Sequence, residues 1–563
     1  VEHRLQIEGS QQRHCLPTKP DELDAFARRL GYANGASFMN DYSDRADQTR
    51  RVLDQFLASE GSGNLWVTEL LDPHSAGESG TARLRTLGFA DAEAARAELL
   101  ALYTGPRERP HSLHVRQQFL KVAPELLQAL ARAAGPDATL LRLGQILSNV
   151  RAPGVIYETL TLAPALCGHL VALVENSEFL ADLLIRDPGL FETFGTSGAL
   201  DRASTREDLD EQLRGLLRAF DTDAAPYRLH MGETLRIGMR DIIAGADVTD
   251  ISRELTQLAE VCLAYAVGKA RAKVVEKYGD ASARFAVLAL GKFAGRELGY
   301  GSDLDLVFVY EAGAPIECGM SPIEYFTAFA SNIIKTLKEP TKYGLLYDVD
   351  ARLRPDGNKG NLVVSDARLR EYYLSEAQAW ERLALIKVRA VGGDAAFGAK
   401  VEHDAASFAY TLPLTDENLD TIEDIRAKLA AASSPLSLKK SEGGMAELEF
   451  AVRLLQIANA AAHPGVAQGD ALAALDALVG AGAVRTEDAA LLRDTYLLFR
   501  RIENRLRVRD GRSTSVLPAD AEDRQDLARR LGIDGDLLSL VESRKERVHR
   551  FYAAVLETLR GTS

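Results

Sequence analysis

The chain has 563 residues, of which 46% are hydrophobic, and its formal net charge is −14 at pH 7. This length suggests about four domains, with ample apolar residues for several buried cores. Proteins that bind DNA or RNA need a broad basic surface. The negative net charge therefore argues against a nucleic-acid partner and favours a protein substrate. Cys15, Cys167, Cys262 and Cys318 are scattered without a Cys-x-x-Cys pair. This argues against a disulfide or zinc framework and suits the cytoplasm.

The N-terminal segment, residues 1–60, is expected to be helical. Three of its short motifs recur near the C-terminus at one constant separation, without a gap. The pairs are Val1–Ile7 with Ile502–Val508, Leu16-Pro17 with Leu517-Pro518, and Ala27–Gly31 with Ala528–Gly532. Self-similarity at a constant separation indicates duplicated modules. The sequence therefore predicts that residues 1–60 are the tail of a truncated first module, and that the chain is the C-terminal part of a longer protein.

Residues 61–109 are predicted to be a linker, because Gly61-Ser-Gly-Asn64 and other polar, turn-forming residues occur there. Residues 110–279 follow with a helical pattern, in which apolar positions recur at intervals of three and four. We expect this region to orient a catalytic module and to receive regulators, although packing support explains any single helix equally well. The longest uncharged run, residues 159–174, is too short to span a bilayer, so no membrane partner is expected.

Strands and helices alternate over residues 280–430, where a first motif places Gly301-Ser302 directly before Asp303-Leu-Asp305. Successive side chains of a strand point to opposite faces, so Asp303 and Asp305 share one face while Leu304 enters a core. Two adjacent carboxylates repel each other unless a cation neutralises them, and hard oxygen ligands at this spacing suit Mg²⁺. The alternative interpretation is a solvated strand end.

A second motif, Leu346–Pro355, is interpreted as another strand, in which Asp348, Asp350, Arg352 and Arg354 fall on one face. Arginine binds phosphate oxygens with two parallel hydrogen bonds, and a carboxylate beside it can complete a metal site. This face suits a metal-bound polyphosphate and supports the metal interpretation of the first motif.

Smaller features add candidate phosphate contacts. The turn after the second motif supplies Lys359 for a triphosphate, with an ordinary hairpin turn as the alternative. Gly301 and Ser302 lack bulk, so the backbone there can approach a phosphate and donate its N–H groups, although this signal is weak alone. Gly291–Gly295 is not a P-loop, because the Lys and Ser/Thr that should follow its second glycine are absent.

The last part of the chain, residues 431–563, is predicted to form a helical bundle. Residues 451–461 and 488–508 carry long apolar faces with charges opposite, as the helices of a bundle do. The residues alone indicate only packing here.

Two runs, Gly291–Phe308 and Val349–Gly360, resemble the glutamine synthetase adenylyltransferase family, also called the adenylyl-removing enzyme. Its catalytic modules are nucleotidyltransferases of the DNA polymerase β type, and they occur as a tandem pair. Residues 297–305 look like the C-terminal, adenylylating copy of that pair. Residues 372–394 and 440–450 also look like the family, although its Asp-Ile-Glu-Phe motif starts with Glu447 in this chain. The likeness extends over almost the whole chain.

The resemblance implies an α+β fold, in which one nucleotidyltransferase-type mixed-sheet domain lies between helical bundles of a mostly helical chain. It implies ATP as a substrate, Mg²⁺ as the cofactor, and transfer of AMP to a tyrosine of glutamine synthetase. Glutamine and the P-II signal protein would regulate the enzyme. Asp303, Asp305 and Asp350 would bind metal and act in catalysis, with Asp350 able to take the phenol proton. The nucleotide would contact Gly291, Gly301, Ser302, Arg352, Arg354 and Lys359.

Two other interpretations stay open from the sequence. A de-adenylylating phosphorylase would use inorganic phosphate and share every carboxylate. A non-catalytic regulatory scaffold would bind glutamine synthetase, although such a module has no need of clustered carboxylates.

Overall fold

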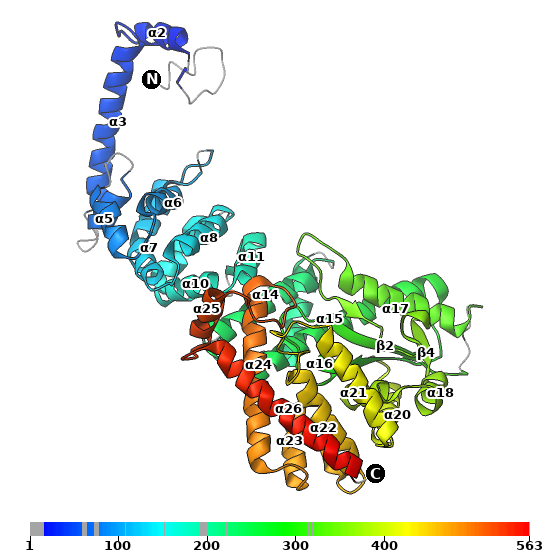
Figure 1. Ribbon diagram of the computed structural model, residues 1–563. Coiled ribbons are helices and arrows are strands. Elements are labelled where there is room, and N and C mark those ends of the chain that lie inside the picture. Colours follow the sequence, from blue (N-terminus) through cyan, green and yellow to red (C-terminus); the bar gives the residue numbers. More distant parts are fainter. Residues whose placement is uncertain are drawn as a thin grey trace. The chain divides into compact units, whose positions relative to one another are not determined.

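The computed structural model describes residues 16–17, 19–58, 65–72, 78–106, 108–150, 152–191, 200–220, 223–313, 316 and 319–561. The chain divides into two compact units (Figure 1). The first comprises Val1–Ala131 and Pro153–Thr161, and the second comprises Arg132–Ala152 and Leu162–Ser563. The first copy of the repeated motif, residues 1–7, lies outside the described residues.

The described part of the first unit is helical. Its helices are α2 (Pro20–Arg29), α3 (Gly35–Ala58), α4 (Leu65–Leu70), α5 (Glu78–Thr86), α6 (Ala92–Thr104), α7 (Leu113–Ala131) and most of α9 (Pro153–Leu162). The structure corrects the prediction of a linker at residues 61–109. Most of the described residues of this range form the helices α4, α5 and α6. Leu70, Leu84 and Leu99 are completely buried there, so the range has the apolar residues that helices need to pack. The turn-forming residues 61–64 lie outside the described residues.

The second unit begins with helices, as the apolar periodicity predicts. They are α8 (Pro136–Ser148), α10 (Ala165–Asn176), α11 (Glu178–Arg186), the 3-10 turn η1 (Pro188–Phe191), α13 (Arg206–Ala219), α14 (Ala225–Ile242) and α15 (Val248–Tyr278). Helix α14 packs against both α11 and α15.

Five strands form one mixed sheet, which confirms the predicted α+β class. The strands are β1 (Phe285–Leu290), β2 (Leu304–Tyr310), β3 (Val349–Asp350), β4 (Val363–Ser365) and β5 (Val388–Gly393). The order is β3-β2-β1-β5, and β4 also pairs with β2. Strand β1 is antiparallel to its neighbours β2 and β5, whereas β3 and β4 run parallel to β2.

Helices cover both faces of the sheet, so β1 is buried along its whole length. On one face Phe285 of β1 stacks on Phe326 of α17 (Pro322–Lys338), with ring centroids 5.4 Å apart. On the other face, Ala286, Leu288 and Leu290 join a core that includes residues of α20 (Ala395–Tyr410). The sheet is therefore a central layer between two sets of helices.

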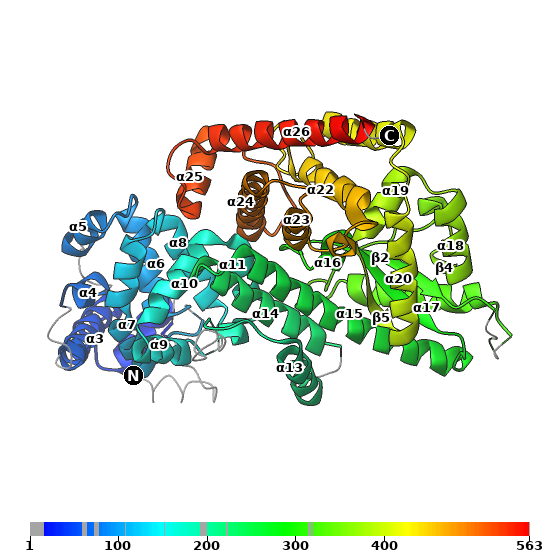
Figure 2. The same ribbon diagram turned by 90° about the horizontal axis from the view of Figure 1, so that it is seen from below.

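Helices follow the sheet to the end of the described chain, and the last five, α22 to α26, lie together in one group (Figure 2). After α16 (Gly291–Ala294) and α17, the remaining α-helices are α18 (Asp366–Ser375), α19 (Ala379–Ala384), α20, α21 (Asp416–Ala431), α22 (Met445–Ala460), α23 (Ala471–Gly480), α24 (Thr486–Asp510), α25 (Ala521–Leu531) and α26 (Leu537–Gly561). Short 3-10 turns are η2 (Gly357–Lys359), η3 (Leu385–Lys387) and η4 (Pro464–Val466).

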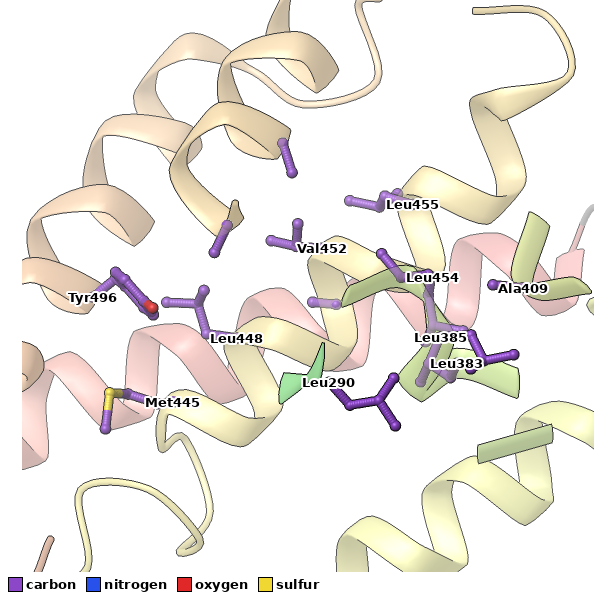
Figure 3. Packing of buried hydrophobic residues seen from close by; sticks show 14 of the residues in the cluster. Leu290, Leu383, Leu385, Ala409, Met445, Leu448, Val452, Leu454, Leu455 and Tyr496 are labelled. Atoms are coloured by element: carbon purple, nitrogen blue, oxygen red, sulfur yellow. The ribbon is translucent and has the colours of Figure 1, made fainter. Parts of the chain in front are cut away.

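One hydrophobic core joins the sheet to these terminal helices. Leu290 at the end of β1 and Leu383 of α19 belong to the same cluster as Leu448 and Val452 of α22 and Tyr496 of α24 (Figure 3). All five residues are nearly or completely buried. The predicted catalytic domain and the predicted terminal bundle thus share their interior.

Cys167 and Cys262 are buried and form no disulfide among the described residues, whereas Cys15 and Cys318 lie outside the described ranges. No single helix described here is long and apolar enough to cross a membrane; α9 and α10 meet that length and composition test only as a bent pair.

Candidate active site

Three carboxylates meet where β2 begins. Asp303 directly precedes β2, Asp305 lies within it, and Asp350 lies in β3. Strands β2 and β3 pair in parallel with Asp305 opposite Asp350. One carboxylate oxygen from each of the three residues lies within 4.8 Å of the others. The two motifs therefore converge as predicted, and oxygens this close can share a divalent cation.

The electrostatics of this carboxylate cluster differ from residue to residue. Burial, followed by the charges of Asp303 and Asp350, raises the pKa of Asp305 to about 7. The pKa of Asp350 is lowered instead, mainly because the Arg352 side chain donates hydrogen bonds to it. A cation held by Asp305 would compete with a proton for the same oxygens, so cation binding and protonation are linked at this residue.

Gly291 shapes the cluster from the neighbouring strand. It directly follows β1 as the first residue of α16, with a φ of +57°, in the left-handed region that favours glycine. A Cβ at this position would lie 2.8 Å from Oδ2 of Asp305. Any side chain at Gly291 would therefore displace a carboxylate of the cluster. Gly301, at φ +60°, makes the turn that leads into Asp303.

Ser302 is buried beside the cluster and is fixed by two donors. Its Oγ accepts hydrogen bonds from the Gly299 N–H at 3.2 Å and from Nη1 of Arg507 at 3.0 Å. A hydroxyl has two lone pairs and one proton, so the Ser302 proton is the hydrogen-bonding capacity that is left. This arrangement makes Ser302 a donor toward a ligand.

The second motif is shorter than predicted. Only Val349 and Asp350 pair with β2, and the chain then turns and enters η2. Asp348 lies outside the carboxylate cluster and pairs with Nζ of Lys338 at 2.7 Å. The ten-residue strand was therefore wrong, because strand periodicity extends only as far as a partner strand does.

The two arginines of this motif have different environments. Nε of Arg352 donates to both carboxylate oxygens of Asp350, at 3.0 and 2.9 Å, and its side chain is 69% exposed. Arg354 instead donates to the backbone oxygens of Asn361 at 2.9 Å and Gly360 at 3.2 Å. Arg352 is free to turn toward a phosphate, whereas Arg354 holds the loop together. Lys359 is exposed in η2, and its phosphate contact stays a prediction.

A buried ionic cluster on α24, which we call the Glu503 cluster, was missed by sequence reasoning. Glu503 is completely buried and accepts hydrogen bonds from Lys292 at 2.7 Å, Arg500 at 2.6 Å and Arg507 at 2.9 Å. Burial alone would raise the pKa of Glu503, but these three cations outweigh it and lower the pKa. Through Arg507, this cluster connects α24 directly to Ser302.

A second ionic contact ties the same segment to α23. Glu297 accepts from Nζ of Lys387 at 2.6 Å and from the N–H of Ala471, the first residue of α23, at 3.1 Å. The sequence analysis singled out the regions that hold most of these residues, Gly291–Phe308, 372–394 and the repeated motif at Ile502–Val508, but it interpreted them as family resemblance and duplication and did not pair their charges. Terminal helices therefore hold both ends of the segment between β1 and β2.

The chain is similar to known proteins over most of its length. Residues 167–404 match the family model described as glutamate-ammonia ligase adenylyltransferase, and residues 424–560 match the one described as GlnD PII-uridylyltransferase. A bifunctional glutamine synthetase adenylyltransferase/adenylyl-removing enzyme of Burkholderia mallei is 31% identical over 547 residues, covering 91% of this chain and 57% of the relative. A protein of the same name from Xanthobacter autotrophicus is 28% identical, covering 99% and 58%. The chain thus spans just over half the length of these relatives.

Proposed function

We propose that the chain transfers AMP from ATP to a tyrosine hydroxyl of glutamine synthetase, releasing pyrophosphate, because residues 167–404 match the family model described as glutamate-ammonia ligase adenylyltransferase. The observation that carries this proposal is the approach of Asp303, Asp305 and Asp350 to within 4.8 Å, on two paired strands. A binding scaffold has no use for a half-buried carboxyl whose pKa is raised to about 7 by burial and by the charges of its neighbours.

The donor set fits Mg²⁺, because it consists only of carboxylate oxygens and includes one carboxyl that like charges and burial destabilise as an anion. Asp303, Asp305 and Asp350 would hold the ion. When bound, Mg²⁺ supplies charge neutralisation on the triphosphate and on the entering and leaving oxygens.

The remaining groups of the site would bind and orient the nucleotide. The Ser302 hydroxyl would donate to a phosphate oxygen, held in place by Arg507. Arg352 would move from Asp350 to the phosphates, which also frees the Asp350 carboxylate to bind metal or to take the phenol proton. Gly291 would act by leaving room for Asp305, and Arg354 by holding the loop that carries Arg352.

The test is AMP transfer with ATP labelled in its α-phosphate, purified glutamine synthetase and Mg²⁺. We expect label on the synthetase with the wild-type chain, and none with Asp303→Asn or Asp305→Asn. Asp348→Asn is the matched control, because Asp348 lies two residues before Asp350 but pairs with Lys338 outside the cluster. Full activity in Asp303→Asn would remove this residue from the catalytic machinery.

De-adenylylation is a second candidate, because the relatives are named for both activities. It would use the same three carboxylates with inorganic phosphate in place of ATP. Mixing the chain with phosphate and AMP-modified synthetase separates the two activities, since ADP forms only in the phosphorolytic direction. ADP production there, without AMP transfer from ATP, would replace the first candidate.

We also propose that the terminal helices regulate AMP transfer, on the basis of the second family match. Residues 424–560, which match the PII-uridylyltransferase model, include α22 to α26, and α24 contacts Ser302 through Arg507. We expect the P-II signal protein and glutamine to act on the catalytic site through these helices. Cytoplasmic location stays a prediction.

A further inference from the structure

A cavity of about 400 Å³ adjoins the loop of residues 298–302, which precedes Asp303. We call this space the α14 cavity and the loop the catalytic loop. Its walls come from α11, α14, α15, the catalytic loop and residues 343–348. The volume falls within the roughly 300 to 1,000 Å³ of pockets that hold small molecules.

Most of the side chains around the cavity are apolar. Phe179 and Leu183 come from α11, Met231 from α14 and Leu255 from α15, and Leu298 belongs to the catalytic loop. Such walls favour a ligand with a flat or ring-like apolar body, since burial of apolar surface drives its entry.

Several polar side chains also line the α14 cavity. For three of them, Thr234, His230 and Tyr347, the structure gives the side chain no hydrogen-bonding partner among the described residues. Thr234 is 5% exposed, and His230 and Tyr347 stand edge to face with ring centroids 5.0 Å apart. Burial lowers the pKa of His230 to about 4, so its imidazole is uncharged at neutral pH. Thr234 is buried, whereas His230 and Tyr347 are half-buried. Polar groups removed from water are normally paired, so these three side chains offer unused hydrogen-bonding capacity to a polar substituent of a ligand.

The α14 cavity is lined by one cation, Arg186, that has no anionic partner among the described residues. Arg186 is exposed, and no described residue accepts a hydrogen bond from its guanidinium. Asp348 also lines the cavity, but Lys338 neutralises it at 2.7 Å. One unpaired cation remains, which suits a single carboxylate and is too little for a polyphosphate.

We propose that the α14 cavity binds a small organic monoanion that has an aromatic body and one uncharged hydrogen-bonding substituent. The carboxylate pairs with Arg186, the ring packs on the apolar walls, and the substituent bonds to Thr234, His230 or Tyr347. Because the catalytic loop forms one wall, a bound molecule contacts the backbone that leads to Asp303. Occupancy therefore slows amide exchange in this loop.

The probe is 4-hydroxyphenylacetate, which combines a ring, a hydroxyl and one carboxylate, and binding is measured by calorimetry on the full chain without ATP or glutamine synthetase. We expect saturable binding that weakens about tenfold in Arg186→Met, the loss of one charge-assisted interaction. Thr234→Val, which keeps the shape of the side chain, should weaken it severalfold. Arg218→Met is the matched control, because Arg218 is an exposed arginine of α13 outside the cavity.

Tyramine, which has the same ring and hydroxyl but an ammonium group, should bind at least about tenfold more weakly than the acid. Hydrogen exchange of peptides covering residues 296–303 should slow with 4-hydroxyphenylacetate and stay unchanged with tyramine. Absence of saturable binding, equal affinity of the acid and the amine, or equal affinity of Arg186→Met and Arg218→Met would each overturn the proposal. No nucleotide is present, so these outcomes are independent of whether the chain transfers AMP.

Discussion

Replacing Glu503 by glutamine tests whether α24 is part of the active site. The substitution keeps the size of the side chain but removes the one negative charge among Lys292, Arg500 and Arg507, whose donor atoms lie 2.6 to 2.9 Å away. Glu503 is completely buried, so water cannot replace the lost charge. Breaking a buried ion pair by removing one partner costs about 3–5 kcal/mol, because the remaining charge stays buried and uncompensated. We expect a loss of stability of this size.

The measurement is denaturant unfolding followed by tryptophan fluorescence. The chain has two tryptophans, Trp66 in the first unit and Trp380 in α19 of the second, so a Trp66→Phe background reports only the second unit. Glu503→Gln should lower the unfolding midpoint, and adding Lys292→Met should recover part of the loss by removing an unpaired cation. Glu487→Gln, an exposed acid in the first turn of the same helix, is the control.

Activity gives a second result for Glu503→Gln. Without Glu503, Arg507 loses a partner and holds Ser302 less firmly, so AMP transfer should fall at temperatures where the variant is still folded.

The pH dependence of the stability follows from the lowered pKa of Glu503. The stabilisation is present above the ordinary glutamate pKa of about 4.3 and is lost as pH falls below it, so the variant should show a shallower acid transition. A variant with the wild-type midpoint and activity would refute the assigned role of the Glu503 cluster.

Two further predictions concern the carboxylate cluster. The raised pKa of Asp305, about 7, means that the folded protein without cation loses stability as pH rises through 7, when the carboxylate becomes charged beside Asp303 and Asp350. Mg²⁺ should therefore raise the melting temperature more at pH 8 than at pH 6; an equal increase at both would argue against a cation at Asp305. Gly291→Ala should abolish AMP transfer, because its Cβ would lie 2.8 Å from the Asp305 carboxylate. Gly313→Ala has a comparable positive φ of +77° but meets no atom within 4 Å, so it should keep activity with similar backbone strain.

Much of the carboxylate cluster is visible in the sequence because its signal is local. The alternation that begins at Asp303 is set by residues that are adjacent in the chain, and the structure keeps it at the start of β2, where Leu304 and Leu306 are buried and Asp305 is half-buried. From the second motif we predicted that Asp348 and Asp350 lie on the same face of one strand. Asp350 lies in the carboxylate cluster, but Asp348 does not, since only Val349 and Asp350 pair with β2. Whether a strand continues depends on its partner, and this information is absent from the strand's own pattern.

The Glu503 cluster shows why the rest was not predictable. Lys292 and Glu503 are 211 positions apart, and Arg507 and Ser302 are 205 apart. A charged residue on an amphipathic helix is normally solvent-exposed, so Ile502–Val508 gave no sign that its charges are buried. Only the packing of α24 against the segment between β1 and β2 makes these residues partners.

These contacts also change what a domain boundary means in this chain. The boundary predicted between residues 430 and 431 separates a sheet domain from a bundle by secondary structure. The structure instead places Leu290 in one core with Leu448 and Val452, and Ser302 receives a hydrogen bond from Arg507. A shared core and a shared hydrogen-bond network place the two parts in one compact unit. A signal received by the terminal helices therefore needs no separate route to the site, because α24 already supplies the donor that orients Ser302.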